Sequence, residues 1–492
     1  MHLQDPSLLE GVTLLPTEAT LSAGTFEVIN PATSTPIARL GDQTAADCEA
    51  AIPKALDALQ TLTSLSARAR SSLLTKWHTL VLNHKTDLAT IITAENGKPT
   101  AEALAEVSYA AEFLYWFAGE AQRINGNVIP SSSSACLEGE RTRVVTLSQP
   151  VGIVGLITPW NFPAAMITRK ISAALAAGCP CILKPATETP LTAIALSNLA
   201  TRAGIPPGAF QILATSAHTV AIGEILTTNR AIRKFSFTGS TPVGKVLAAR
   251  CMGTMKRVSM ELGGNAPVIV FDDADLQKAV DGIMAAKFRL AGQTCVCANR
   301  VFVQEGIYDV LVPALVERVR RDLRLGNGAD EGTTMGPLVS ASAADKVLRH
   351  VEDAVARGGK VLTGGRVASE LGEAFFEPTV VVEVHPDSLC MREETFGPLL
   401  PIVRFETEEE AVALANAVPV GLAGYIFTEN IARCSRVSEA LEVGMVGVNT
   451  GKISDPAVPF GGIKESGLGR EGSSLGIHEY LEVKSITINT AP

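Results

Sequence analysis

The chain has 492 residues, of which 46% are hydrophobic and 19% charged, a balance typical of globular proteins with large cores. Its formal net charge of −9 excludes nucleic acid and anionic membranes as the main partner. No uncharged apolar run reaches the roughly 18 residues of a membrane span, and the acidic N-terminal segment fits neither a secretory signal nor a transit peptide. Nine scattered cysteines indicate reduced thiols and a cytoplasmic location.

The first third of the chain is predicted to be mainly helical. Residues 1–45 have the composition of loop and short strand, whereas Ala, Leu and Glu dominate residues 46–125. Pro130 and the four serines after it interrupt that pattern. Residues 141–147 then have the composition of a strand, as do residues 486–489 near the C-terminus. We expect these two segments to pair as an arm that leaves the body of the protein.

From residue 151 onward, predicted strands and helices alternate. The strands are expected at 151–157, 180–183, 210–213 and 234–238, and the helices at 164–177, 190–203, 219–227 and 243–250. Strands separated by helices of this length predict right-handed βαβ units and a parallel, doubly wound sheet. A second α/β series follows from residue 267 to residue 405.

These segments divide the chain into three predicted parts. We expect a dinucleotide-binding domain at 1–127 and 151–263, an α/β catalytic domain at 264–470, and a β oligomerisation arm at 128–150 and 471–492. An arm of this kind leaves an unpaired sheet edge unless a partner chain covers it. The sequence therefore predicts a homodimer or a homotetramer.

Cys295 is the strongest candidate for a reactive side chain. It follows a helix-like run over residues 276–290 that ends at Gly292. A thiol just past a helix, on a turn relieved by glycine, can face a cavity, where its thiolate acts as a nucleophile. An isolated cysteine is otherwise a small buried hydrophobic residue. Cys297, two residues on, suggests either a reversible disulfide, if the loop bends enough, or an inert packed thiol.

Two further polar residues follow predicted strands. Glu261 precedes Gly263 and Gly264 in an apolar frame, which raises a carboxyl pKa and suits a base for water. Capping of the glycine-rich turn is the alternative role. Asn161 lies between two prolines, so its amide is held rigidly and suits a developing oxyanion, although an Asn there can also cap the next helix.

Two strand ends carry candidate dinucleotide contacts. Gly239 and Ser240 lie where a strand turns into a helix, so backbone N–H groups and the helix N-terminus can hold a phosphate. A simple strand-to-helix turn is the alternative. Lys184 can bond an adenosine ribose, or it is a solvated lysine at a strand end. Thr187 occupies the position where NAD-preferring sites often place a carboxylate, and it tolerates a 2′-phosphate, although Glu188 is adjacent.

Two arginines lie in segments that are otherwise apolar. Arg169 is inside the run 164–183, and Arg289 precedes Cys295 by six residues. A buried arginine needs an anionic partner or a polar cavity. Two such cations directed at one pocket would hold a distal carboxylate, and Ser454 could add a hydroxyl. An internal salt bridge is the alternative for each arginine.

Taken together, the motifs resemble the aldehyde dehydrogenase superfamily over essentially the whole chain. TPWNFP, FTGS, MELGG, GQTC and EETFGP occur in the family's order. FPAAMITRK, KFRLAGQTCVCANR and PFGGIKESGLGREGSSLGI look like its succinate-semialdehyde dehydrogenase branch. The resemblance implies an aldehyde-dehydrogenase-like α/β fold, a nicotinamide dinucleotide cofactor and a four-carbon semialdehyde acid as substrate.

The resemblance also implies roles at the matching positions. Cys295 would attack the aldehyde, Asn161 would share the oxyanion with the Cys295 backbone N–H, and Glu261 would activate water to hydrolyse the thioester. Lys170 and Glu482 match positions that assist proton movement in some relatives. The implied cofactor contacts are Trp160, Lys184, Thr187, Gly239, Ser240, Leu262, Glu394 and Phe396.

We therefore expect oxidation of succinate semialdehyde to succinate. NADP is predicted as the preferred cofactor because of Thr187, with NAD as the weaker alternative, and no metal site is predicted. Glutarate semialdehyde or another aldehyde is an alternative substrate. A CoA-dependent acylating enzyme is disfavoured by Glu261, and a catalytically silent binding protein is disfavoured by the intact set of Cys295, Glu261 and Asn161.

Overall fold

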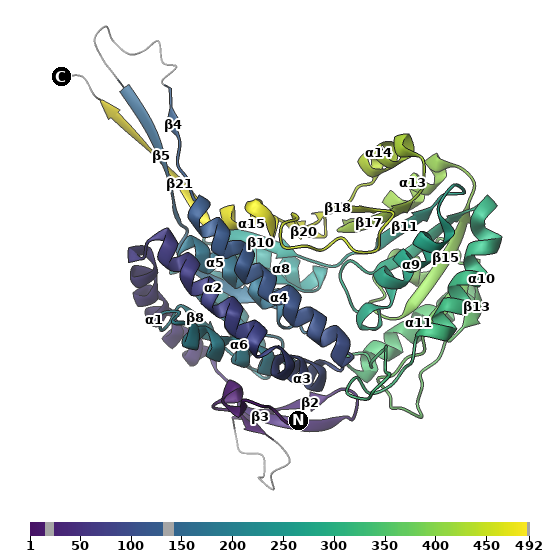
Figure 1. Cartoon of the computed structure of the whole chain (residues 1–492), viewed down its shortest axis with the longest axis horizontal. Coiled ribbons are helices and arrows are strands. Elements are labelled where there is room, and N and C mark those ends of the chain that lie inside the picture. The colour runs from purple at the N-terminus through teal and green to yellow at the C-terminus, as the bar shows by residue number, and fades with distance from the viewer. Residues whose placement is uncertain (15–23, 131–141, 490–492) are drawn as a thin grey trace.

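The computed structural model describes residues 1–14, 24–130 and 142–489. Figure 1 shows two halves, each built on a mainly parallel sheet, and an arm of strands that extends from the N-terminal half. This is the α/β architecture that the sequence predicts, with a doubly wound sheet, a second α/β sheet and a β arm. Among the described residues, no helix is both long enough and apolar enough to cross a membrane.

The segment before the first parallel sheet is mostly helical, as its composition predicts. Thr44 and Asp47 form a reciprocal capping box at the start of α1, and Gly97 ends α3 in a left-handed conformation, with φ of 86°. The elements are η1 (Pro6–Leu9), β1 (Thr13–Leu14), β2 (Thr25–Asn30), β3 (Thr35–Gly41), α1 (Ala45–Ser64), α2 (Ala67–Asn83), α3 (Lys85–Asn96), α4 (Thr100–Glu120) and η2 (Ala121–Arg123).

The first parallel sheet has the strand order β20-β10-β9-β6-β7-β8, and its short edge strand β20 is antiparallel. From β6 the chain adds β7 and β8 on one side, and then β9 and β10 on the other, so the strand order reverses between β6 and β9. Such a reversal opens a crevice at the carboxyl ends of the strands. The elements are β6 (Ile153–Ile157), α5 (Ala165–Ala177), β7 (Cys181–Lys184), α6 (Pro190–Ala203), β8 (Phe210–Ile212), α7 (Thr219–Thr228), β9 (Ile232–Thr238), α8 (Thr241–Met252), β10 (Arg257–Glu261) and β20 (Gly467–Leu468).

The second sheet has the order β13-β14-β15-β12-β11-β17-β18, with β13 antiparallel to its neighbour. Its strands are almost wholly apolar because helices cover both faces. Its elements, together with the small β16–β19 pair, are β11 (Ala266–Val270), α9 (Leu276–Lys287), η3 (Arg289–Gly292), β12 (Ala298–Gln304), α10 (Glu305–Asp322), α11 (Ala341–Ala356), β13 (Lys360–Thr363), β14 (Thr379–Val382), α12 (Leu389–Arg392), β15 (Leu399–Phe405), α13 (Glu408–Asn416), β16 (Val420–Gly421), β17 (Ala423–Phe427), α14 (Ile431–Ala440), β18 (Met445–Val448) and β19 (Ile463–Lys464).

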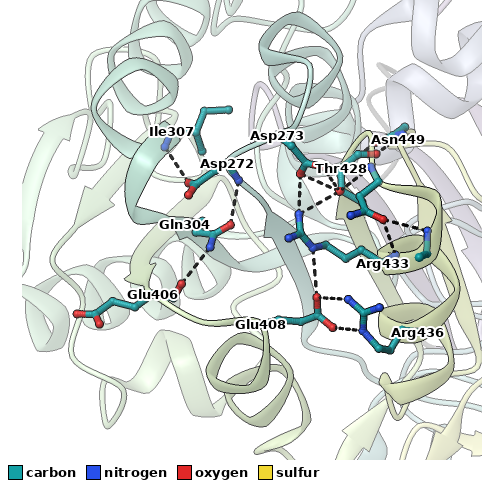
Figure 2. A network of polar contacts seen from close by, with 12 residues as sticks. Asp272, Asp273, Gln304, Ile307, Glu406, Glu408, Thr428, Arg433, Arg436 and Asn449 are labelled. Carbon is teal, nitrogen blue, oxygen red and sulfur yellow. Dashed lines mark hydrogen bonds and ion pairs between the residues drawn. The ribbon is translucent and has the colours of Figure 1, made fainter.

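A polar network fills the carboxyl edge of the second sheet (Figure 2). Asp273, just after β11, accepts hydrogen bonds from Thr428 Oγ1 at 2.8 and 2.9 Å and from Arg433 Nη1 at 2.8 Å. Glu408 then accepts from Arg433 Nε at 3.2 Å and from Arg436 Nε at 2.6 Å. The strand ends at this edge are therefore joined to one another through their own side chains.

The arm is an antiparallel sheet of order β21-β5-β4, made of β4 (Val128–Ile129), β5 (Thr142–Pro150) and β21 (Leu481–Asn489). The predicted pairing of its two long strands is confirmed, with Ile486 opposite Val145. Residues 131–141 and 490–492 of the predicted arm lie outside the described residues. Helix α15 (Ser473–His478) leads back into the arm. The domain boundaries stay a prediction; β20, from the proposed catalytic segment, adds a strand to the first sheet.

Candidate active site

A cavity lies between the carboxyl edge of the first sheet and the amino edge of the second. The first sheet provides the residues after β6, β9 and β10, and the second provides the residues before β12 and β15. Most of the predicted catalytic and cofactor residues meet here. The lining residues are Pro159, Trp160, Asn161, Met166, Thr238, Gly239, Ser240, Leu262, Gly263, Cys295, Lys346, Glu394 and Phe396.

One wall of the cavity is the glycine turn from β9 into α8, which the sequence predicts to hold a dinucleotide phosphate. A Cβ at Gly239 would lie 2.4 Å from the ring of Phe237, so only glycine fits the turn from β9 into α8. The N-terminus of α8 then presents unpaired backbone N–H groups and the positive end of its dipole to a phosphate. The Oγ1 of Thr238 is buried in this wall without a hydrogen-bond partner among the described residues. A free polar atom beside a glycine turn fits a polar ligand.

The nicotinamide end of the predicted cofactor site is lined by an aromatic pair and a carboxylate. Trp160 and Phe396 pack edge to face, with ring centroids 5.7 Å apart. Glu394 Oε1 accepts a hydrogen bond from Gly264 N at 3.1 Å, and burial raises the pKa of its carboxyl to about 7. Lys346 donates from Nζ to the Glu394 carbonyl at 2.6 Å and lines the same cavity, a residue that sequence reasoning missed.

Lys184 and Thr187 lie at the same sheet edge but outside the walls of this cavity. Strand β7 pairs with β6, and Lys184 is opposite Ile157. Lys184 Nζ donates to the carbonyl of Pro185 at 3.0 Å, and Thr187 Oγ1 donates to the carbonyl of Thr215 at 2.9 Å. A dinucleotide that follows the carboxyl edge from β9 across β6 would reach them with its adenosine half. The donor set along this edge fits such a cofactor.

Cys295 is presented by a strained turn rather than by a helix end. The sequence predicts a helix as far as residue 290, but α9 ends at Lys287. Leu290 and Ala291 have φ of 50° and 51°, and Gly292 has φ of 76°. A Cβ at Gly292 would lie 2.2 Å from the carbonyl oxygen of Gly397. Left-handed conformations of this kind cost about 1–3 kcal/mol each for residues other than glycine, so the surrounding contacts must hold the turn.

The Cys295 thiol is half-buried and faces the cavity. Burial is the largest cause that raises its pKa, to about 12, and the nearby carboxylates of Glu261 and Glu394 raise it further. The guanidinium groups of Arg169 and Arg289 act in the opposite direction. These surroundings therefore favour the thiol form of Cys295, and added positive charge or a nearby base would favour the thiolate.

The amide of Asn161 is oriented on both sides. Its Nδ2 donates to the carbonyl of Gln293 at 3.0 Å, and its Oδ1 accepts from Phe162 N at 3.1 Å. An amide nitrogen carries two hydrogens, so one remains for a ligand in the cavity. Asn161 and Cys295 line the same cavity, which is the arrangement that an oxyanion site requires.

Glu261 is a buried carboxyl with free oxygens. Neither oxygen has a hydrogen-bond partner among the described residues. Burial raises the pKa of Glu261 to about 8, and the negative charge of Glu471 adds to that effect. The cations Arg169, Lys170 and Arg470 oppose it. A carboxyl with a pKa near neutrality and free lone pairs is suited to take a proton from water.

Glu471 forms the centre of a buried charge cluster behind Glu261. Its Oε2 lies 2.6 Å from Nε of Arg169, and its Oε1 accepts a hydrogen bond from Lys170. Lys170 Nζ also donates to Ser236 Oγ at 3.1 Å. Glu482, which the resemblance matches to a position that assists proton movement, lies on β21 with a 58% exposed side chain, 3.5 Å from Arg257. The acid beside Lys170 is therefore Glu471, which sequence reasoning missed.

A second, smaller cavity continues from Cys295 to the predicted substrate arginines. Arg169 lies over the ring of Phe460 at 4.1 Å, and Arg289 lies 5.1 Å from the centre of the Phe162 ring. Arg289 is solvent-exposed, whereas Arg169 is buried. The lining residues are Tyr109, Phe162, Met166, Arg169, Arg289, Thr294, Cys295, Val296, Ser454 and Phe460.

The far end of this cavity gathers two cations and two hydroxyl groups. The Tyr109 hydroxyl lies within hydrogen-bonding reach of Ser454 and Arg169. Arg169 uses its Nε for Glu471, so the alternative of an internal salt bridge also holds for this residue. Its Nη2 lies 3.2 Å from the Sδ of Met166, and both residues line the cavity. An anionic group at this position would meet several donors.

Comparison with known proteins agrees with this geometry. A model of the aldehyde dehydrogenase family matches residues 19–486. The chain belongs to the aldehyde dehydrogenase family. It is 52% identical over 469 residues to succinate-semialdehyde dehydrogenase [NADP(+)] 1 of Schizosaccharomyces pombe, covering 95% of this chain and 93% of that one.

Two other relatives of this aldehyde dehydrogenase are informative. The 3-sulfolactaldehyde dehydrogenase of Pseudomonas putida is 49% identical over 490 residues, or 99% of each chain. The crystal structure of succinate-semialdehyde dehydrogenase from Burkholderia pseudomallei superposes with a TM-score of 0.94 at 46% identity, covering 99% of this chain and all of that one.

Cys297 of this aldehyde dehydrogenase is directed into a separate buried site. Lys287 Nζ donates to its Sγ at 3.3 Å and to Asn299 Oδ1 at 3.2 Å, and Cys297 has no exposed surface. Cys297 is not part of either cavity wall. A disulfide with Cys295 would require this contact with Lys287 to break, and that disulfide stays a hypothesis.

Three residues of this site were not found from the sequence. Tyr109, Glu471 and Lys346 come from α4, from the segment before α15 and from α11, far from Cys295 along the chain. For Glu471 a signal exists, because adjacent cations on an apolar helix, Arg169 and Lys170, require a buried acid. The sequence does not say which acid that is. Among the described residues, no group of three or more His, Cys, Asp or Glu could hold a metal ion.

Proposed function

We propose that this aldehyde dehydrogenase oxidises succinate semialdehyde to succinate, with NADP as the preferred cofactor. The observation that carries the proposal is the cavity that leads from Cys295 to Arg169 and Arg289. A substrate whose aldehyde carbon meets the sulfur would place a distal carboxylate beside these cations. The relatives that act on succinate semialdehyde support the same substrate.

In the first half of the reaction, the Cys295 thiol loses its proton to water, and the sulfur bonds to the aldehyde carbon. The π electrons of the carbonyl move to oxygen, and the free hydrogen of the Asn161 amide and the Cys295 backbone N–H stabilise that oxyanion. A nicotinamide dinucleotide, when bound, supplies the acceptor for the hydrogen and two electrons that leave this carbon. Cys295 then carries a thioester.

In the second half, Glu261 removes a proton from water as the water oxygen bonds to the thioester carbon. The carbon–sulfur bond breaks, the acid is released and Cys295 leaves as a thiolate. Because Glu261 is buried and, in the described part of the chain, neither of its oxygens has a partner, it can orient water without first breaking a hydrogen bond. The positive charges of Arg169 and Lys170 lower the pKa of Glu261 and so favour its ionised form.

The preference for NADP is supported by Thr187, an uncharged side chain at the carboxyl end of β7. A carboxylate at this position would repel a 2′-phosphate, whereas the ammonium of Lys184 at the same strand end attracts it. We expect a higher kcat/KM with NADP than with NAD, and reversal of that order in Thr187→Glu. Activity with NAD at least equal to that with NADP would contradict the preference.

A substrate panel tests the proposed reaction. Succinate semialdehyde and butanal have the same chain length, but butanal ends in a methyl group. A site built for a carboxylate should favour the acid by about 100-fold in kcat/KM, because butanal leaves buried donors unpaired. Equal kcat/KM for the two aldehydes would contradict the proposed substrate. Cys295→Ala should abolish cofactor reduction with both, which also tests the alternative of a silent binding protein.

A sulfonate-ended aldehyde is the second candidate. Tyr109 and Ser454 add two hydroxyls to the two guanidinium groups, and a sulfonate offers three acceptor oxygens where a carboxylate offers two. One relative acts on 3-sulfolactaldehyde according to its name. The panel should therefore also include 3-sulfolactaldehyde and glutarate semialdehyde. Their kcat/KM values show which anionic group and which chain length the site prefers.

We also propose that the arm mediates assembly into a homodimer or a homotetramer. On the arm, the side chains of Val128 and Val483 are 70% and 71% exposed. Exposed apolar side chains on a sheet edge are typical of a surface that a partner chain covers. Light scattering distinguishes the two sizes, and a monomer would contradict both. The cytoplasmic location stays a prediction, which fractionation of cells tests.

A further inference from the structure

A polar corner behind the cavity wall holds the loops that carry Asn161 and Cys295. The corner lies where α3 ends and α4 begins, and we call it the α3–α4 corner. Its polar side chains are Asn96, Lys98, Glu102 and Glu106. In the described part of the chain, none of the four lines the cavities around Cys295.

The corner binds the backbone of the Asn161 loop. Lys98 Nζ donates to the carbonyl of Asn161 at 2.8 Å, and Asn96 Nδ2 donates to the carbonyl of Trp160 at 2.9 Å. Lys98 is fully buried, forms an ion pair with Glu106, and lies 4.2 Å from the Phe162 ring centre. A buried ammonium group that holds a carbonyl in this way leaves the loop little freedom to shift.

Glu106 fixes the other end of the same loop. Its Oε1 accepts hydrogen bonds from Ala164 N at 2.8 Å and from Ala165 N at 3.3 Å, where α5 begins. A carboxylate at this position also interacts favourably with the positive end of the α5 dipole. The loop from Trp160 to Ala165 is therefore held at both ends by one corner.

The corner also binds the strained turn before Cys295. Both carboxylate oxygens of Glu102 accept from Leu290 N, at 2.9 and 3.2 Å. Leu290 and Ala291 have left-handed φ angles, which persist only where neighbouring contacts fix them. Glu102 belongs to α4, in the other half of the molecule. Among the contacts described for this turn, it is the charged side chain that comes from that half.

The corner bridges the two halves of the protein. Thr100 N donates to the carbonyl of Gly328 at 2.9 Å, and a Cβ at Gly336 would lie 2.1 Å from the carbonyl oxygen of Gly97. This close packing of backbone on backbone fixes the corner against the second half. It can therefore set the position of a loop from each half.

We propose that the α3–α4 corner is a positioning element that sets the distance between the Asn161 amide and the Cys295 sulfur. Its side chains act only through the backbone of the two loops, so they are positioning residues rather than catalytic ones. The proposal rests on the roles proposed for Asn161 and Cys295. Displacement by about 1 Å of groups that act together can lower a rate by roughly 100-fold, so small shifts of either loop would be visible in kcat.

A pair of substitutions at Glu102 tests the proposal. Glu102→Leu removes the acceptor for Leu290 N, whereas Glu102→Gln keeps one carbonyl oxygen there. We expect Glu102→Leu to lower kcat by about 30-fold with unchanged KM for the cofactor, and Glu102→Gln to stay within about threefold of the wild type. Glu112→Leu, an exposed glutamate of the same helix, serves as the matched control. Rates are taken per reactive Cys295, counted by alkylation.

A double-mutant cycle with Asn161→Ala separates positioning from general loss of structure. If Glu102 acts through the alignment of Cys295 with Asn161, its loss should cost less than about threefold once Asn161 is already absent. Wild-type kcat in Glu102→Leu, or an equal loss in both backgrounds, would overturn the proposal. If Glu102→Leu does not fold, Asn96→Ala is measured in the same cycle, with about a tenfold loss expected in the wild-type background.

The double-mutant cycle tests the positioning role independently of the proposed substrate. It is measured with whichever aldehyde of the panel the wild type oxidises fastest. Rejection of succinate semialdehyde would overturn the substrate proposal alone. Full activity of Asn161→Ala would contradict the role proposed for Asn161, and the Glu102 pair would still decide whether the corner positions Cys295.

Discussion

The carboxyl edges of the two parallel sheets are used in opposite ways. At the edge of the first sheet, polar atoms are left free: both oxygens of Glu261 and the Oγ1 of Thr238 have no partner among the described residues. At the edge of the second sheet, Asp273 and Arg433 belong to a network in which the strand ends bind one another (Figure 2). The unpaired polar groups of the first edge can bind a ligand, whereas the paired side chains of the second edge stabilise the fold.

Topology alone does not explain this difference. In the second sheet, too, the strand order reverses, because β12 and β15 lie on one side of β11 while β17 and β18 lie on the other. A crevice for a ligand is therefore possible at both edges. The side chains after the strands decide which edge stays open, so function is carried by these residues and not by the architecture. Four substitutions test this contrast between the two edges.

The largest effect is expected for Glu261→Gln, at the carboxyl edge of the first sheet. An amide cannot take a proton from water, so thioester hydrolysis should slow by about 1000-fold. Stability should be unchanged or higher, because a buried carboxyl is replaced by a neutral group. A single burst of cofactor reduction, with acylated Cys295 detected by mass spectrometry, would show the block after the first half-reaction. Steady turnover at the wild-type rate would exclude Glu261 as the base.

Arg289→Met should have the next largest effect, on substrate choice. Loss of this cation is expected to lower kcat/KM for succinate semialdehyde by about tenfold, a moderate effect because Arg289 is solvent-exposed. The kcat/KM for butanal should be unchanged. For succinate semialdehyde, kcat/KM should fall less in Arg289→Lys than in Arg289→Met. An equal loss for both aldehydes would indicate a structural role instead of contact with the distal acid.

Glu471→Gln should shift the pH dependence of thioester hydrolysis. Glu261 acts in its ionised form, and its pKa of about 8 means that the rate rises as the pH passes that value. Glu471 raises the pKa of Glu261, while Arg169, Lys170 and Arg470 lower it. Removal of the negative charge should therefore move the acid limb of the profile to lower pH.

The matched control for this shift is Glu482→Gln. Glu482 pairs with Arg257 on the arm, away from the charge cluster, so its loss should leave the pH profile in place. Profiles normalised to their own maxima are compared, because Glu471→Gln can also reduce the maximal rate. A profile of Glu471→Gln that coincides with the wild type would contradict the coupling between the two acids.

The smallest effect is expected at the carboxyl edge of the second sheet. Arg433→Met removes the side chain that joins Asp273 to Glu408 and should lower the free energy of unfolding by about 1–2 kcal/mol, with kcat unchanged. Arg436 binds only the Glu408 end and is 59% exposed, so Arg436→Met should stay within about 0.5 kcal/mol. Chemical denaturation measures both. A loss of kcat in Arg433→Met would mean that the two edges are coupled.

Much of the fold and of the candidate site could be predicted from local patterns in the sequence. The alternation of apolar strands and helices predicted the doubly wound sheet, and the turn signals at Asn161, Gly239 and Gly292 located the loops around one cavity. These features are local: periodicity, glycine turns and prolines act within a few residues, so they can be read along the chain. The motifs placed Cys295, Glu261 and Asn161 in roles that remain proposals, as do the domain boundaries.

Contacts between residues far apart in the sequence became visible only in the folded chain. The pairing of Lys170 with Glu471 spans 301 residues, and that of Glu102 with Leu290 spans 188. The helix before Cys295 ends at Lys287. In the turn that follows, Glu102 of a distant helix binds Leu290 N, where Leu290 and Ala291 are left-handed. A buried charge requires a partner, but the chain position of that partner is set by packing, which no local pattern encodes.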